Sequence, residues 1–166
     1  MRALLGLAVV AAWAQELGTS CLPCHSEHVA DVRAHKHGAR QVGCEVCHGV
    51  SETHRNASGG VAPDRVAAPD EVPLLCGGCH GEERKQYLAS KHGKLVMARS
   101  KIRAPSCGVC HGVHAQRNAV AMRRQCDRCH TDLPASCKPG QAPPAGKLVC
   151  AQCHAPHSLQ TSPRPG

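Results

Sequence analysis

The sequence predicts a mostly irregular chain with short α-helices and little or no β-structure. Its 166 residues include no Phe, one Trp and one Tyr, so the side chains that normally dominate core burial are scarce. Twelve Pro and sixteen Gly interrupt regular elements, and no segment shows a convincing strand pattern. The side chains alone do not supply a core. We therefore expect the chain to be unfolded without a further apolar component.

Six copies of Cys-x-x-Cys-His indicate how such an apolar component could be attached to the chain. Two thiols followed at once by a histidine form the attachment signature of c-type haem. The thiols bind the porphyrin covalently, and the imidazole reaches the iron from one face. We therefore predict six covalently attached haem c groups, and a fold organised around their stack. The attachment cysteines are Cys21, Cys24, Cys44, Cys47, Cys76, Cys79, Cys107, Cys110, Cys126, Cys129, Cys150 and Cys153. The proximal ligands are His25, His48, His80, His111, His130 and His154.

Tandem zinc ribbons are the alternative interpretation of paired cysteines. A single motif could be half of a zinc site. However, a histidine follows every cysteine pair, and only one of the thirteen cysteines, Cys137, lies outside the motifs. This regularity favours haem.

The motifs form three units, at residues 21–54, 76–114 and 126–157, within one domain predicted for residues 15–166. The first two units share Lys-His-Gly, at residues 36–38 and 91–93, and each ends in a further histidine. This is an internal duplication. The third unit keeps the paired motifs but lacks Lys-His-Gly. Short helices are predicted at Glu27–His35, Glu82–Ser90 and Asn118–Arg124, and a linker at residues 56–73.

Seven further histidines indicate a second imidazole for most irons. The six distal candidates are His28, His37, His54, His92, His114 and His157. His35 is left out because His37 belongs to the repeated motif. Three of the candidates follow a proximal histidine by three residues, so we expect them to bind a neighbouring haem rather than their own. The spacing does not identify which iron each candidate serves.

The first fourteen residues have the features of a signal peptide. Arg2 precedes an apolar stretch, and residues 12–14 fit the small-x-small cleavage rule. The stretch is too short to span a bilayer, so we expect an exported protein, periplasmic or extracellular, without an integral membrane span. The net charge of +8 does not indicate nucleic-acid binding, because the basic residues are scattered without aromatic partners. Haem propionates are better partners for them.

The first two units resemble the multihaem cytochromes c of the doubled-motif type. The stretch Cys44-Glu-Val-Cys47-His48-Gly49, with His54 behind it, is similar to the decahaem cytochromes of outer-membrane conduits, and the small tetrahaem periplasmic cytochromes are related. The resemblance implies electron transfer, without enzymatic activity, through mostly bis-histidine haems. Implied partners are other redox proteins: a membrane quinol-oxidising cytochrome, a terminal reductase or an outer-membrane conduit.

The third unit departs from this pattern at its first motif. Without Lys-His-Gly, the iron at His130 could take His35, Met122 or Cys137, or keep an open position. An open position would make a multihaem reductase the alternative function. A subunit of an extracellular cytochrome filament, in which chains share ligands, is a further alternative.

Overall fold

The computed structural model describes residues 17–132, 150 and 153–161. The described residues form short α-helices joined by irregular segments and contain no strand, only an isolated bridge between His154 and Thr161. The predicted fold class is confirmed for this part of the chain. The predicted signal peptide and Cys137 lie outside the described residues.

The helices are all short, the longest having nine residues. They are α1 (Ser26–Ala34), α2 (Lys36–Ala39), α3 (Cys44–His48), α4 (Glu52–Asn56), α5 (Val72–Cys76), α6 (Gly81–Ala89), α7 (Lys91–Met97), α8 (Cys107–His111) and α9 (Ala119–Asp127). The three helices predicted from the sequence correspond to α1, α6 and α9. The other six were not predicted, because each is too short to show a helical period.

The internal duplication is also present in three dimensions. Helices α1 and α2 pack as a pair in the first unit, and α6 and α7 pack in the same way in the second. The glycine of Lys-His-Gly lies where the helices meet. A Cβ on Gly38 would collide with the backbone of Val32 and Arg33, and one on Gly93 with the backbone of Tyr87 and Leu88. Only a residue without a side chain allows this approach.

Helices α3 and α8 are also equivalent, because each consists of one Cys-x-x-Cys-His motif. Each ends at a glycine, Gly49 or Gly112, with φ of 74°. Left-handed backbone of this kind favours glycine. This requirement explains why both motifs continue as Cys-His-Gly.

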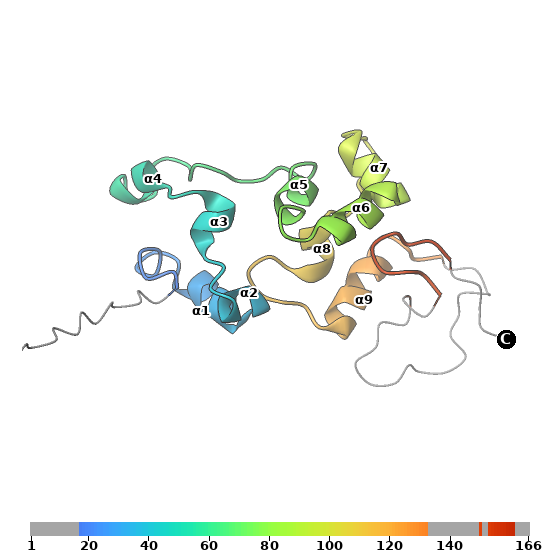
Figure 1. The fold of residues 1–166 in the computed structure, drawn as a ribbon, viewed down its shortest axis with the longest axis horizontal. Helices are drawn as coiled ribbons and strands as arrows, with labels where there is room; N and C mark the ends of the chain where they lie inside the picture. The colour runs from blue at the N-terminus through green and yellow to red at the C-terminus, as the bar shows by residue number, and fades with distance from the viewer. Residues whose placement is uncertain (1–16, 133–149, 151–152, 162–166) are drawn as a thin grey trace, which may run out of the picture.

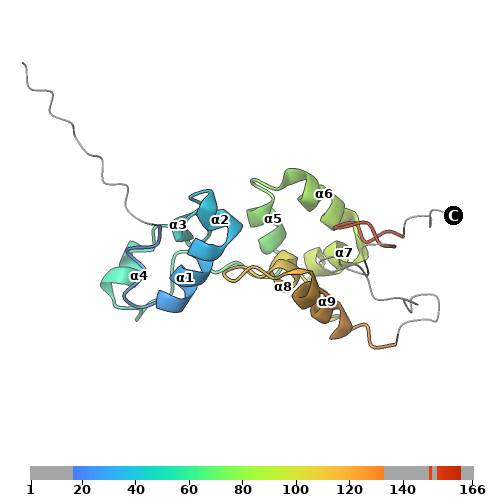
Figure 2. The ribbon, with the colours of Figure 1, turned by 90° about the horizontal axis from the view of Figure 1, so that it is seen from below.

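The units follow one another along the long axis of the molecule (Figure 1). Helices α1–α4 lie at one end, and α5–α9 lie beyond them. The segment between α8 and α9 runs back toward α1 and α2 before it returns to α9, as Figures 1 and 2 both show. This excursion carries His114 from the second unit toward the first.

Few apolar side chains are buried in the part that the structure describes. The buried ones are Val29, Tyr87, Val96 and Pro73, and the Tyr87 hydroxyl donates to the carbonyl of Pro105 over 2.8 Å. Many other apolar residues are exposed, among them Val50, Val66, Ile102 and Val120. The described chain therefore contains only a small protein core. None of its helices is long and apolar enough to cross a membrane.

Candidate haem sites

The first cysteines of the two motifs in each unit lie side by side. The thiol of Cys44 is within hydrogen-bond reach of Cys21, and that of Cys126 is within reach of Cys150. In the second unit the hydrogen bond from Cys107 lowers the pKa of the Cys76 thiol to about 6. The pairing of motifs read from the sequence is thus a spatial pairing.

The sulfurs also connect one unit to the next. Cys47 interacts electrostatically with Cys76, and Cys126 interacts with Cys110. Together with the contacts within units, these approaches link the six motifs in chain order. Burial is the largest cause that raises the pKa of Cys47, Cys110 and Cys126, the last to about 11. These sulfurs are therefore partly buried.

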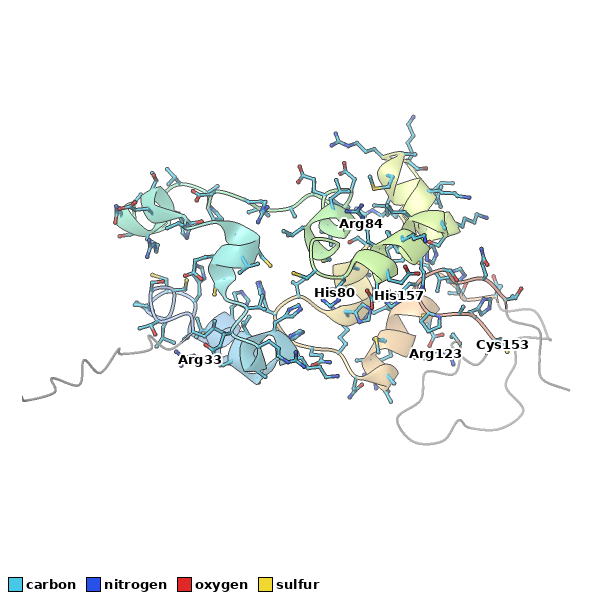
Figure 3. All side chains as sticks on the ribbon, in the orientation of Figure 1. Arg33, His80, Arg84, Arg123, Cys153 and His157 are labelled. Atoms are coloured by element: carbon cyan, nitrogen blue, oxygen red, sulfur yellow. The ribbon has the colours of Figure 1, made fainter. Side chains whose placement is uncertain are left out.

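Five of the proximal histidines face a second imidazole at nearly constant distance. The ring centres are 6.1 Å apart for His25 and His54, 6.1 Å for His48 and His114, 6.0 Å for His80 and His37, 5.9 Å for His111 and His157, and 6.0 Å for His130 and His92. Five of the six distal candidates are among these partners. Figure 3 shows two of the histidines, His80 and His157, in the central region of the molecule.

A spacing of about 6 Å fits two imidazoles bound to one metal from opposite sides. Each metal–nitrogen bond is about 2 Å long, and a ring centre lies about 1 Å beyond its nitrogen. Two side chains in direct contact would approach more closely, as His35 and His37 do at 4.6 Å. The residues present therefore fit the haem irons that the six motifs imply.

The electrostatic surroundings keep several of these imidazoles neutral. Burial is the largest cause that lowers the pKa of His92, His111 and His114, and in each case the facing histidine lowers it further. A metal is bound by the neutral imidazole. The fold thus favours the protonation state that ligation needs.

Backbone carbonyls orient three of the rings. The Nδ1 atom of His48 lies 3.0 Å from the carbonyl of Arg65, that of His54 lies 2.6 Å from Val61, and that of His154 lies 3.1 Å from Leu159. A ring that donates through Nδ1 presents Nε2 as the ligand atom. All three rings are therefore arranged as ligands.

His28 differs from the other distal candidates. Its ring centre is 6.2 Å from that of His25 and 4.5 Å from that of His114. The shorter distance shows that His28 packs against His114, which already faces His48. His28 thus lies between two histidine pairs, in direct contact with the ring of His114.

His35 acts as a helix cap. Its Nδ1 accepts a hydrogen bond of 3.0 Å from the backbone of His37 at the start of α2. Ser90 occupies the same place in the second unit, where its hydroxyl accepts from the backbone of Gly93. An alignment of residues 35–38, His-Lys-His-Gly, with residues 90–93, Ser-Lys-His-Gly, would have shown that His35 and Ser90 occupy equivalent positions.

Replacing His35 with alanine is expected to destabilise the haem-loaded protein by about 1 kcal/mol, because α2 loses its N-cap. His35→Ser, the matched variant, restores the hydroxyl cap of the second unit and should recover most of the loss. Chemical denaturation followed in the haem absorbance measures both. A change in the spin state of an iron in His35→Ala, at full haem content, would instead indicate that His35 is a ligand.

Two arginines that the sequence did not single out hold the motif helices. Arg65 donates to the carbonyls of Cys47 and Val46, each over 2.7 Å. Arg117 donates to Gly108 over 3.0 Å and to Val109 over 2.8 Å. In both places an arginine binds two backbone carbonyls of a one-turn helix. The unequal loop lengths before Arg65 and Arg117 conceal this correspondence in the sequence.

Helical, strand-poor architecture and successive Cys-x-x-Cys-His motifs with facing imidazoles define the class of multihaem c-type cytochromes. A family model described as Cytochrome c3 matches residues 36–131, more than half of the chain. The chain belongs to this family, and it carries covalently bound haem c and transfers electrons. Comparison with curated proteins and with solved structures gives no match.

Proposed function

We propose that this chain is a hexahaem electron carrier whose haems form one continuous relay in the order of the motifs. The observation that carries the proposal is the set of five imidazole pairs, each about 6 Å apart. A haem iron held by two imidazoles changes its oxidation state and offers no position to a substrate. Five such haems are conductors rather than catalysts.

The sulfur contacts support a single relay. Each motif approaches the next one along the chain, within and between units. A porphyrin attached at each motif would therefore lie beside its neighbours, from the first unit to the third. Many of the attachment sites are open to solvent, since Cys24, Cys79, Cys129 and Cys153 are exposed. Haem edges near these residues would be accessible to other redox proteins.

The location and partners follow from the same proposal. The family is typically periplasmic, and the predicted signal peptide at residues 1–14 agrees with export. We propose that the protein passes electrons between a membrane quinol-oxidising cytochrome and a terminal reductase or an outer-membrane conduit. An open iron at the fifth motif is not favoured, because His92 faces His130.

The experiment that tests the proposal counts the haems. Pyridine haemochrome absorbance, divided by the protein concentration from amino-acid analysis, should give six haems per chain. The oxidised protein should be predominantly low-spin, and dithionite should reduce every haem. Fewer than six haems, or a colourless product that contains zinc, would contradict it.

A further inference from the structure

The second unit contains a basic segment that the first unit lacks. Between Lys-His-Gly and the next haem motif, the first unit has five residues, 39–43, whereas the second has thirteen, 94–106. Residues 91–103 include five Lys and Arg and no Asp or Glu, although basic residues elsewhere are spread along the chain. The longer connection therefore concentrates positive charge in one unit only.

This segment is exposed at the edge of the molecule. Helix α7 lies at the upper edge in Figure 1, and Figure 3 shows side chains that end in nitrogen extending outward from it. Two apolar side chains lie among the basic ones, with Met97 exposed to 39% and Ile102 to 66%. Lys94 and Met97 lie on the same side of α7, because they are one turn apart. The exposed residues that form this surface, called the α7 patch, are Lys94, Met97, Arg99, Lys101, Ile102 and Arg103.

Arg99 attaches the end of this segment to the rest of the second unit. It follows the last turn of α7 with a left-handed φ of 47°, a conformation that favours glycine. Its Nε donates to the carboxylate of Asp70 over 2.8 Å. A charged side chain kept in a strained backbone position indicates a functional constraint. Here the ion pair ties residues 100–103 to the segment that precedes α5.

The remaining basic side chains of the α7 patch have no ionic partner among the residues that the structure describes. Lys94, Lys101 and Arg103 form neither a hydrogen bond nor an ion pair there, and none of them belongs to a haem motif. At moderate salt an exposed charge acts over about 8–10 Å. These three charges are therefore available to a negatively charged surface outside the molecule.

An anionic lipid surface fits this combination better than an acidic protein does. A bilayer offers phosphates to Lys and Arg, and an apolar boundary just below the headgroups to Met97 and Ile102. It is fluid and broad, so it accommodates a projecting edge of a protein. A protein partner would instead need a surface complementary in shape to this edge, with places for both apolar side chains.

We propose that the α7 patch docks the protein reversibly on membrane surfaces rich in anionic phospholipids. Lys94, Lys101 and Arg103 lie at the phosphates, and Ile102 inserts between the headgroups. Helix α7 also carries His92, which faces His130, so docking brings the fifth motif close to the bilayer. Docking itself requires no particular number of haems. The consequence that electrons enter or leave at the fifth haem rests on the proposed function.

Vesicle sedimentation tests the docking with the haem-loaded protein. Sucrose-loaded vesicles of phosphatidylglycerol and phosphatidylcholine in equal parts are compared with vesicles of phosphatidylcholine alone. The protein should sediment with the anionic vesicles at low salt and remain in solution with the neutral ones. Added sodium chloride should release it, because salt screens the attraction. No sedimentation with the anionic vesicles at low salt would overturn the proposal.

A triple variant locates the docking surface. Each basic residue near an anionic surface strengthens binding roughly fivefold, so the loss of three should weaken it by about a hundredfold. The variant combines Lys94→Gln, Lys101→Gln and Arg103→Gln. Its matched control removes the same charge from exposed positions in α4, in α9 and after α2, with Arg40→Gln, Arg55→Gln and Arg124→Gln. The control should bind the vesicles nearly as the parent protein does. Equal losses in the two variants would show that net charge rather than the α7 patch is responsible.

Ile102→Ser separates a membrane from an acidic protein as the partner. This variant keeps every charge, so it should bind a polyglutamate resin as the parent protein does but bind the anionic vesicles several-fold more weakly. Binding of the parent protein to polyglutamate without binding to the vesicles would overturn the proposal in favour of an acidic protein.

Haem measurements distinguish failure of the docking from failure of the relay. A changed haem content or reduction potential in the triple variant, with unchanged vesicle binding, would assign its charges to haem propionates and overturn the docking. Fewer than six haems in a parent protein that still binds the anionic vesicles would overturn the proposed function and leave the docking intact.

Discussion

Replacing His92 with alanine is expected to open the fifth haem. His92 is half-buried and faces His130 at 6.0 Å, and no other histidine lies opposite that ring among the residues that the structure describes. The iron would retain one imidazole and become reactive toward exogenous ligands. The reduced variant should bind one carbon monoxide more per chain than the parent protein, and one more iron should become high-spin in the EPR spectrum.

The control for this variant is His28→Ala. His28 lies 6.2 Å from the proximal ring of His25, but it follows His25 by only three residues and packs against His114 at 4.5 Å. Carbon monoxide stoichiometry and spin state should both match those of the parent protein. If His28→Ala opened a haem and His54→Ala did not, His28 rather than His54 would be the ligand opposite His25.

Replacing Gly93 with alanine is expected to destabilise the packing of α7 against α6. The new Cβ would collide with the carbonyl oxygen of Tyr87 and come within 2.8 Å of the Cα of Leu88. These are backbone atoms, which cannot rotate away, so α7 must move off α6. We expect a loss of about 2 kcal/mol or more, a lower thermal midpoint of the haem-loaded protein, and partial high-spin character at the fifth iron, because α7 carries His92.

Gly81→Ala is the matched control. Gly81 begins α6, and a Cβ there meets no atom within 4 Å. Alanine is favoured over glycine in helices by about 0.5–1 kcal/mol, so this variant should be neutral or slightly more stable. Equal destabilisation by the two substitutions would show that the packing of α6 against α7 is not what requires glycine at position 93.

The sequence was sufficient to predict the architecture because its strongest signals are local. Six complete attachment motifs and an almost aromatic-free composition indicate a helical, strand-poor chain, and the three longest helices contain enough residues for recognition. The one-turn helices at Cys44 and Cys107 depend instead on their haem motifs and flanking glycines. They have no apolar face of their own from which a helix could be predicted.

The sequence could not predict which histidine lies opposite which proximal histidine, because these pairs depend on the tertiary structure. His114 reaches His48 only because the segment after α8 returns to the first unit. The expectation that His114 and His157 lie near a motif other than their own agrees with the observed placement. The same spacing argument applied to His28, whose ring packs against that of His114.

If the facing histidines ligate the irons as proposed, their pairing across units has a consequence for assembly. In a chain that is exported N-terminus first, His54 follows His25 closely, so the first site can close early. The site at His48 must wait until His114 has emerged, and the site at His111 must wait for His157. Covalent attachment and completion of the iron's coordination are therefore separated in time. Partly exported molecules would carry attached haems with reactive irons, and the segment after α8 is the element that ends this exposure for the first unit.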